Sequence, residues 1–304
     1  MKPWRYQAFG LTISSDIELP MLLGAKKYAR AQVKILKGRI SKEGFKAARV
    51  KALHYQTAPG KLWLEIPMSG RFLITNGNQI KYQPAEKVDN DTIGLFLIGT
   101  CMGALLQQRG LIVLHAMAVK HNNKALIFAS FSGEGKTTLA AVMHKKSYEI
   151  LTDDICVIDK NHLVLPGYPM LKIWRDCFRV LKIKPGELKP IRPQVAKYAY
   201  PVKTGFSQTP LPAKAMYILH TWNKDQPQIT EIKGMHKLMP LQSQIYRAQY
   251  LEGMGLMKDN IQNLIKLAGK INITSLTRPQ TNYKVTDLIK LIEKDLTNKQ
   301  KARK

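Results

Sequence analysis

Short apolar runs separated by turn residues make up the first third of the chain. Residues 61–66, Lys-Leu-Trp-Leu-Glu-Ile, alternate between polar and apolar side chains as a half-buried strand does. Asn76 and Gly77 lie between two such runs and are a strong signal for a tight hairpin turn. We expect strands at residues 8–13, 32–36, 61–66, 71–75 and 79–82. The pattern therefore predicts a β-rich N-terminal region over residues 1–88.

A longer apolar segment, residues 93–106, is expected to form a buried helix. The polar residues 89–91 supply an N-cap before it, and Gly110 ends it. Gly94, Gly99 and Gly103 interrupt the segment, which is shorter than the roughly 18 apolar residues that a membrane span requires. We therefore expect a helix inside the protein and no association with a membrane.

The pattern changes after residue 110, where short apolar strands begin to alternate with helical segments. Apolar runs at 111–114, 116–119 and 125–128 are followed by a glycine-bearing loop, a helix from 136 to about 145, and strands at 150–151 and 155–158. This strand–loop–helix–strand unit is typical of α/β domains. Further on we expect a proline-rich, loop-rich middle at 166–201, strands at 215–219 and 271–276, and helices at 241–250, 260–270 and 285–296. We predict an α/β domain over residues 89–298 and a basic tail over 299–304.

Composition indicates whether the chain can form a hydrophobic core and in which compartment it is expected. Hydrophobic residues make up 45% of the 304 positions, which is enough for an ordinary core. The three cysteines, Cys101, Cys156 and Cys177, are odd in number and widely spaced, so we expect buried reduced thiols rather than disulfides or a metal site. The first residues contain no apolar signal core. We therefore expect a cytoplasmic protein.

The formal net charge of +27 favours anionic partners. Nucleic acid is the first class to consider, but the lysines run through the whole chain, and we find neither a zinc-finger spacing nor an RNA-recognition signature. An acidic or phosphorylated ligand is the partner that we expect instead. The oligomeric state stays open, a homo-oligomer included.

The segment most informative about chemistry is residues 130–137, Ser-Phe-Ser-Gly-Glu-Gly-Lys-Thr. It fits the P-loop pattern except that Ser130 replaces the first glycine. Glycines let consecutive backbone N–H groups face one anion, the lysine reaches the β- and γ-phosphates, and the threonine hydroxyl ligates Mg²⁺. The alternative is a glycine-rich turn with a chance Gly-Lys-Thr. We expect the nucleotide phosphates to be bound by Ser130, Ser132, Gly133, Glu134, Gly135, Lys136, Thr137 and Thr138.

Two further groups are candidates for catalysis. Asp153 and Asp154 follow an apolar run, where carboxylates hold Mg²⁺ or accept a proton, but both serve one site only if the strand ends or bends there. A surface turn or a helix cap is the alternative for this pair. His115 lies in an apolar strand, where a lone histidine is more often a core residue than a functional one.

Three segments in this order resemble the catalytic core of the HPr kinase/phosphorylase family, whose fold is related to phosphoenolpyruvate carboxykinase. They are Leu-His-Ala at 114–116, Ser-Gly-Glu-Gly-Lys-Thr at 132–137 and Leu-Thr-Asp-Asp at 151–154. Residues 6–15, 167–174 and 197–198 are similar to HPr-kinase-like proteins near peptide-maturation genes, including lasso-peptide precursor kinases. The Arg-Gly-Leu-Gly signature of the true HPr enzymes is absent, so neither phosphorylase activity nor HPr as substrate is implied.

The resemblance implies a P-loop kinase domain of the HPr-kinase/phosphoenolpyruvate-carboxykinase type, α/β in class (α+β overall), after a β-rich N-terminal part. It implies that Lys136 and Thr137 bind ATP and Mg²⁺, that Asp153 shares the metal, and that Asp154 is the catalytic base. His115 then orients an aspartate near the acceptor. Which aspartate is the base stays open.

For two basic residues we expect roles outside catalysis. Lys197 is expected to be solvated, with closure over the phosphates as the alternative, and Arg247 is expected to form a salt bridge on a helix.

We therefore expect an ATP-dependent kinase that transfers the γ-phosphoryl group to a serine or threonine hydroxyl of a protein or peptide. Two alternatives remain. One is a nucleotide-binding regulatory ATPase module that transfers no phosphate to an acceptor. The other, suggested by the charge, is a nucleic-acid-associated ATPase. The sequence names neither the acceptor nor the pathway.

Overall fold

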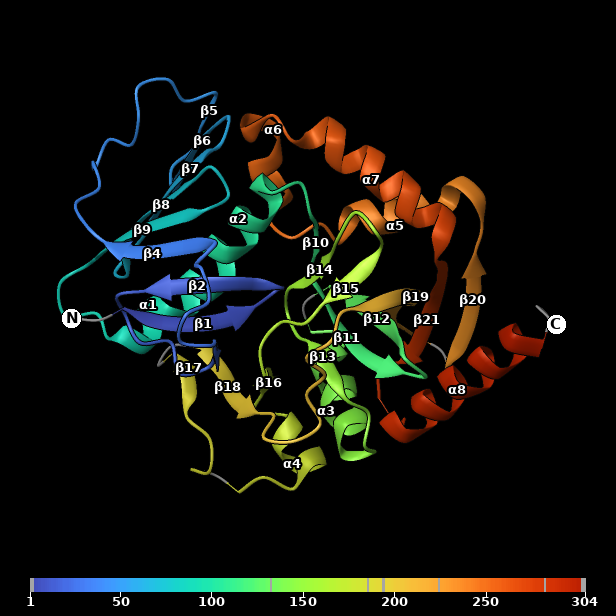
Figure 1. The fold of residues 1–304 in the computed structure, drawn as a ribbon. Coiled ribbons are helices and arrows are strands. Elements are labelled where there is room, and N and C mark those ends of the chain that lie inside the picture. The colour runs from blue at the N-terminus through green and yellow to red at the C-terminus, as the bar shows by residue number, and fades with distance from the viewer. Residues whose placement is uncertain are drawn as a thin grey trace.

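The computed structural model describes residues 3–131, 133–184, 186–192, 195–223, 225–281 and 283–301. Strands and helices alternate in a mixed α/β architecture with several sheets (Figure 1). In the described part an N-terminal sheet has the spatial order β3-β1-β2-β4-β9-β8-β7-β6-β5. Its strands are β1 Trp4–Ala8, β2 Leu11–Ser15, β3 Leu23–Gly24, β4 Val33–Lys37, β5 Val50–Lys51, β6 Tyr55–Ala58, β7 Lys61–Ile66, β8 Gly70–Thr75 and β9 Gln79–Pro84. The β-rich N-terminal part is confirmed.

Turn chemistry sets the register of this sheet. Asn76 and Gly77 both have positive φ, of 52° and 63°, and join β8 to β9 as the sequence predicts. A second turn of this kind was not predicted. Phe9 and Gly10, with φ of 53° and 71°, fold the chain back so that Ala8 pairs with Leu11. The single strand expected over residues 8–13 is therefore wrong, and a hairpin of β1 and β2 stands in its place.

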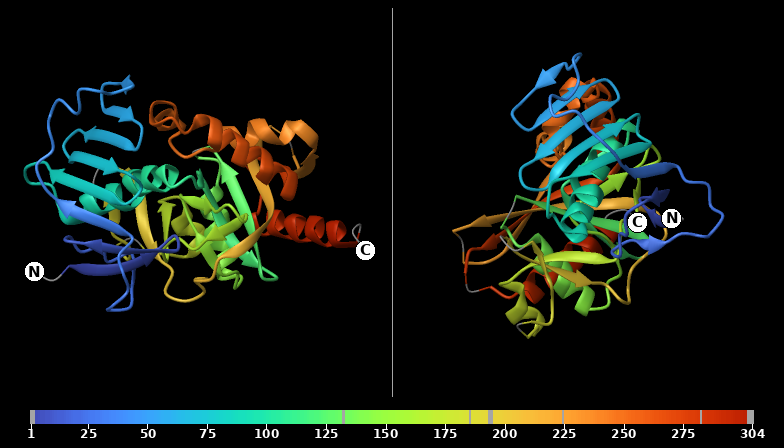
Figure 2. Two further views of the ribbon diagram at one scale, coloured as in Figure 1. Left: turned by 45° about the horizontal axis from the view of Figure 1, so that its top comes forward. Right: turned by 90° about the vertical axis from the view of Figure 1, so that its left-hand side faces the viewer.

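The helix expected at 93–106 is present and packs under the N-terminal sheet. It runs through α1 Asn90–Phe96, a π-helical turn at Leu97–Cys101, and α2 Met102–Gln108. The Thr92 N–H donates to the Asp89 side chain at 2.6 Å, which confirms the expected N-cap. Its apolar side chains share one core with those of the sheet. Figure 2 shows the N-terminal sheet and the C-terminal helix at opposite ends of the molecule.

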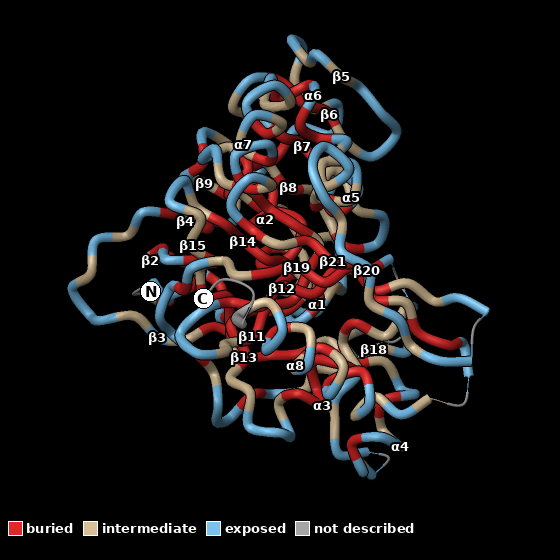
Figure 3. The backbone as a smooth tube through the Cα atoms, turned by 90° about the vertical axis from the view of Figure 1, so that its right-hand side faces the viewer, coloured by how far each residue is buried: buried red, intermediate tan, exposed pale blue. Residues whose placement is uncertain are grey.

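A second sheet forms the centre of the molecule (Figure 3). Within the described residues its order is β10-β14-β15-β19-β12-β11-β13, with β21 paired to β19 and β20 to β21. Its strands are β10 Ile112–Leu114, β11 Ala116–His121, β12 Lys124–Ser130, β13 Ile150–Thr152, β14 Cys156–Ile158, β15 Leu163–Leu165, β19 Leu211–Trp222, β20 Gln228–Ile232 and β21 Asn272–Pro279.

Helices cover both faces of this sheet because its central strands are apolar on both sides. From β12, Leu126 and Phe128 join the core with α3 (Lys136–Lys145) and α8 (Val285–Lys301). Ile127 and Ala129 point to the other face, toward α5 (Leu238–Ser243) and α7 (Met257–Lys270). The predicted helices near 136–145, 260–270 and 285–296 are thus confirmed. Residues 302–304 of the expected basic tail lie outside the described residues.

Two expectations about the middle and the end of the chain are wrong. The proline-rich segment 166–201 is not mainly loop: β16 (Met170–Trp174), β17 (Pro190–Arg192) and β18 (Val195–Pro201) form a third sheet beside α4 (Cys177–Leu181). The helix expected at 241–250 is broken into α5, a bridge to β10, a 3₁₀ turn at Ala248–Tyr250, and α6 (Leu251–Met254). The 3₁₀ turn Gly234–Lys237 precedes α5.

Two expected properties can be compared with the described chain directly. None of its helices is long and apolar enough to cross a membrane. All three cysteines are described, buried and free of disulfide bonds, as expected.

Candidate functional site: a glycine-rich loop facing two aspartates

The loop between β12 and α3 is shaped by two glycines. Gly133 and Gly135 have φ of 91° and 94°, values that side-chain-bearing residues rarely adopt. The first residue of α3, Lys136, follows directly, so the positive end of a ten-residue helix faces the loop. From β21, the Arg278 Nε donates to the Glu134 carbonyl at 2.9 Å and anchors the loop from behind.

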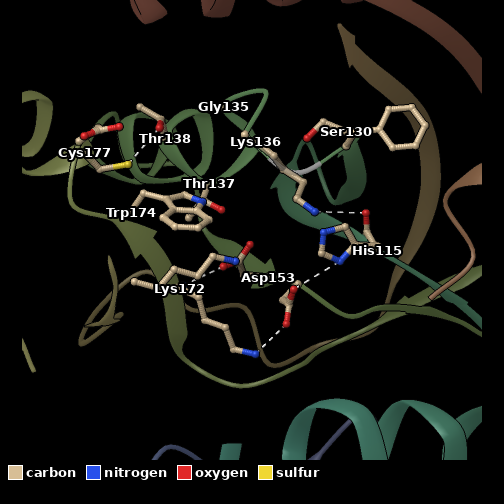
Figure 4. Close-up of a pocket in the computed structure, with 15 residues that line it drawn as sticks. His115, Ser130, Gly135, Lys136, Thr137, Thr138, Asp153, Lys172, Trp174 and Cys177 are labelled. Carbon is tan, nitrogen blue, oxygen red and sulfur yellow. Dashed lines mark hydrogen bonds and ion pairs between the residues drawn. The ribbon is translucent and has the colours of Figure 1, made fainter. Parts of the chain in front are cut away.

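Most of the predicted phosphate-binding residues line one cavity of about 310 Å³ (Figure 4). They are Ser130, Gly133, Gly135, Lys136, Thr137 and Thr138. Glu134 is not among the residues that line it, and Ser132 lies outside the described residues. The predicted loop and its helix therefore form one wall of this cavity.

Lys136 is the cation at the centre of this wall. Its side chain is buried, and its Nζ donates to the His115 carbonyl at 3.2 Å. Burial lowers the pKa of this ammonium group, although the carboxylates of Asp153 and Asp154 oppose the shift. A buried lysine with few neutralising contacts favours an anionic ligand, which would compensate the charge.

The two aspartates reach the same cavity because strand β13 (Ile150–Thr152) ends directly before them. The last strand residue is Thr152, and Asp154 adopts a positive φ of 68°. The chain bends there, so the carboxylates of both Asp153 and Asp154 line the cavity opposite the loop. The strand thus ends and bends at the pair, as the sequence analysis required for both aspartates to serve one site. The alternative of a surface turn does not fit, since Asp153 is buried.

The neighbours of the two carboxylates differ. Asp153 Oδ2 accepts the Lys172 backbone N–H at 3.0 Å, while its Oδ1 is buried with no hydrogen-bond partner among the described residues. Asp154 Oδ2 lies 2.7 Å from the Lys172 Nζ and its Oδ1 lies 3.4 Å from the His115 Nδ1. One aspartate thus has an unused oxygen, and the other is held between a lysine and a histidine.

These neighbours move the two pKa values apart. Burial and the adjacent Asp154 raise the pKa of Asp153 above its ordinary value. Burial raises the pKa of Asp154 as well, but the charge and hydrogen bond of Lys172 together with His115 and Lys136 outweigh burial and lower that pKa. Asp154 is therefore ionised at neutral pH. A further cation beside Asp153 would stabilise its ionised form, which burial and Asp154 disfavour.

His115 connects the loop to the aspartates. It sits between β10 and β11, and its ring stacks on Tyr246 with a centroid distance of 6.1 Å. Burial and the Lys136 charge lower its pKa from 6.5 to about 4, so the ring is neutral at physiological pH. The structure thus brings together Lys136, the aspartate pair and His115, the four residues that the sequence singled out for catalysis.

The third sheet adds residues that the sequence analysis did not assign to the site. Lys172 and Trp174 project from β16, and Lys197 of the paired strand β18 lies 4.7 Å above the Trp174 ring. The sequence offered Lys172 only as one of several basic residues that follow the aspartates, without a role in the site. Alternation along 172–174 was the available signal, because positions two apart on a strand share a face. Asp176, Cys177 and Phe131 complete the wall.

A second cavity, of about 440 Å³, adjoins the first. Four residues line both: His115, Asp154, Lys172 and Lys197. Beyond this shared wall, the second cavity is bounded by the π-helical turn and by Tyr246 and Arg247. Asp154 therefore faces two spaces, one beside the glycine loop and one on the far side of it.

The described residues contain no group of three or more His, Cys, Asp or Glu side chains able to hold a metal ion.

No protein-family model matches the chain, and no curated protein matches its sequence significantly. Among solved structures the chain is similar to the HPr(Ser) kinase/phosphatase from Coxiella burnetii, with a TM-score of 0.33 and 9% sequence identity over 62% of this chain and 98% of that one. At this TM-score the likeness carries no conclusion about activity or substrate, which we infer below from the chain's own residues.

Proposed function

We propose that the protein is a cytoplasmic, ATP-dependent kinase that phosphorylates a serine or threonine hydroxyl of a protein or peptide. One observation carries the proposal: Asp154 lies in the wall between the cavity at the glycine loop and a second cavity. A nucleotide in the first cavity and an acceptor in the second would meet at this carboxylate. A regulatory ATPase has no need of an acceptor cavity beside its phosphate loop.

The first cavity suits the phosphates of ATP. The backbone N–H groups of the loop and the start of α3 provide donors and a positive end, and Lys136 provides a full charge. Lys197 lines the same cavity from the opposite sheet, which supports a role in closing over the phosphates. Positioning and charge neutralisation of this kind supply most of the catalysis in phosphoryl transfer.

The residues beside the loop also fit Mg²⁺. The ion prefers oxygen ligands and is commonly held by one or two carboxylates together with substrate phosphates. Thr137 offers a hydroxyl, and Asp153 offers a buried oxygen that has no hydrogen-bond partner in the described part of the chain, together with a raised pKa that a cation would reverse. When bound, the ion neutralises charge on the β- and γ-phosphate oxygens.

The chemistry assigned to the protein itself is small. The acceptor oxygen forms a bond to the γ-phosphorus as the bond from that phosphorus to the bridging oxygen of ADP breaks, and the electron pair leaves with ADP. The hydroxyl proton passes to Asp154, which Lys172 keeps ionised at neutral pH. Neutral His115, 3.4 Å from the other carboxylate oxygen, fixes the orientation of Asp154.

Labelled ATP separates this proposal from its two alternatives. The protein is incubated with Mg²⁺, ATP labelled at the γ-phosphate, and a pool of serine and threonine peptides, and the products are separated. A kinase transfers label to peptide and forms ADP in equal amount. Label found only in inorganic phosphate would favour a regulatory ATPase, and label release that rises on adding nucleic acid would favour the nucleic-acid-associated one.

A further inference from the structure

The second cavity carries more positive than negative charge. Lys172, Lys197 and Arg247 line it, and Asp154 is the one carboxylate among its described lining residues. Asp154 is already matched by Lys172 at 2.7 Å. Two cations, Lys197 and Arg247, therefore face the cavity without a carboxylate of the described chain to balance them there.

Arg247 belongs to the second cavity and not to the first. It does not line the cavity at the glycine loop, whereas Lys197 lines both. The nucleotide phosphates proposed for the first cavity therefore leave the Arg247 charge unexplained. This exposed side chain forms no ion pair with the described residues, so the salt bridge expected from the sequence is not found.

The chain holds Arg247 at the cavity in an unfavourable backbone conformation. Its φ is 51°, in the left-handed region that an arginine rarely adopts. The preceding residues are fastened to β10: the Tyr246 N–H donates to the Val113 carbonyl at 2.9 Å, and the Gln244 carbonyl accepts the His115 N–H at 2.7 Å. These bonds replace the helix that the sequence predicted. Backbone strain that neighbouring residues enforce is found often at functional sites, and here it lies beside His115.

The opposite wall is shaped by the π-helical turn. Gly99 and Thr100 line the cavity there, and the apolar Phe96 and Ile191 flank them. Single π-turns inside α-helices are frequent at functional sites. The cavity thus offers a cationic side at Arg247 and Lys197, an apolar side, and the Asp154 carboxylate between it and the nucleotide cavity.

We propose that Arg247, together with Lys197, binds an anionic group that the acceptor carries beside the hydroxyl to be phosphorylated. This inference rests on the proposed function and names its substrate class: a serine or threonine next to a carboxylate or a phosphate, with an apolar neighbour. Arginine suits either anion, since its planar guanidinium forms paired hydrogen bonds with both. The contact fixes the hydroxyl beside Asp154 by holding the group next to it.

The test measures peptide binding first and transfer second. Short capped peptides with a central serine and one neighbouring residue that is aspartate, phosphoserine or asparagine are compared by fluorescence anisotropy without nucleotide. We expect the two anionic peptides to bind at least roughly tenfold more tightly than the asparagine peptide, the scale of a charge-assisted pair. The ratio between the two anionic peptides identifies which anion the cavity takes.

Three variants make the test specific. Arg247→Gln should weaken the preference for anionic peptides, because only Lys197 then remains to bind the anion, and Arg247→Glu should abolish it. Arg30→Gln removes the same charge from an exposed loop position and should keep the wild-type preference. Nucleotide affinity should be the same in all four proteins, because Arg247 lies outside the nucleotide cavity.

The outcomes separate the two proposals. Equal affinity of wild type for anionic and neutral peptides overturns the anion site, even if phosphate is transferred. An unchanged preference in Arg247→Gln overturns it as well. If the preference follows Arg247 as expected but no peptide is ever labelled from ATP, the anion site stands and the proposed kinase activity is contradicted.

Discussion

Two adjacent aspartates receive different roles from their neighbours alone. Asp153 is buried with an unused oxygen and a raised pKa, which fits a cation ligand. Asp154 is ionised because Lys172 lies 2.7 Å from it, which fits a group that takes a proton. Since the bond from phosphorus to the leaving oxygen of ADP is largely broken before the bond to the acceptor oxygen is far advanced, a weakly basic carboxylate is sufficient for the acceptor hydroxyl.

The first prediction separates these roles. Asp154→Asn should bind ATP·Mg²⁺ much like wild type but transfer phosphate roughly tenfold more slowly or worse, because a general base is lost. Asp153→Asn should instead raise the Mg²⁺ concentration needed for half-maximal transfer. Nucleotide affinity and single-turnover transfer across a Mg²⁺ series measure both effects. Wild-type transfer rates in both variants would show that the pair takes no part in the chemistry.

The second prediction concerns acid stability. The folded protein holds the pKa of His115 at about 4, below the ordinary 6.5, through burial and the Lys136 charge. Between these two values the unfolded chain binds a proton that the folded chain does not, so the free energy of unfolding falls as pH drops through this window. His115→Gln should reduce that fall, as measured by urea unfolding at several pH values.

Exposed His54 on the N-terminal sheet provides the control for this experiment. His54→Gln removes a histidine of the same kind from a position away from the cavity. It should leave the pH dependence of unfolding close to that of wild type. If His115→Gln and His54→Gln behave alike, the environment assigned to His115 is wrong.

At the scale of elements, local signals were sufficient where the chain itself decides the structure. The glycine loop, the start of α3 at Lys136 and the Asn76-Gly77 hairpin follow from backbone preferences of a few residues, and all were predicted. Segment 241–250 failed because its helical pattern competes with hydrogen bonds to β10, more than a hundred residues earlier. Lys172 and Trp174 were missed because prolines suggested loop where a sheet forms.

The third prediction tests the packing that positions Tyr246 and Arg247. A Cβ added at Gly103 would lie 2.7 Å from the ring of the buried Tyr246, closer than a Cβ atom approaches a neighbour in real structures, so the ring would have to shift. Gly103→Ala should therefore lower the free energy of unfolding by about 1–3 kcal/mol, as overpacking does. It should also weaken binding of anionic peptides, because the ring precedes Arg247.

Gly269 is the matched control for this substitution. It lies in α7, and a Cβ there would meet no atom within 4 Å. Gly269→Ala should be neutral or stabilise the protein by up to about 1 kcal/mol, because alanine is the better helix former. Urea unfolding of both variants decides the matter, and equal stability of the two would contradict the close contact at Gly103.

At the scale of the whole molecule, the site depends on parts that are distant in sequence. The N-terminal sheet shares one core with α1, α2 and Tyr246, so residues outside the predicted P-loop domain support the wall of the second cavity. The loop and the aspartates were predictable because each carries its signal within a few residues. The second cavity was not, since it exists only where segments far apart in the sequence, from residue 95 to residue 247, meet.

The fourth prediction concerns the net charge of +27. The lysines are spread over the chain and accompany no recognition motif, so duplex DNA and RNA should bind weakly and without sequence preference. Binding should also fall steeply as salt rises, because counterion release supplies nearly all of its free energy. A titration at physiological salt that shows tight and sequence-selective binding would favour the nucleic-acid-associated ATPase instead.

The central claim is that phosphate is transferred from ATP bound at the glycine loop, and Lys136 tests it most directly. The measurement is transfer of γ-label from ATP to peptide by wild type, Lys136→Ala and Lys146→Ala, where Lys146 is an exposed lysine just beyond the same helix. We predict that Lys136→Ala remains folded and loses transfer by roughly a hundredfold or more, the scale of a lost transition-state contact, while Lys146→Ala retains it. Wild-type transfer by folded Lys136→Ala would contradict the account.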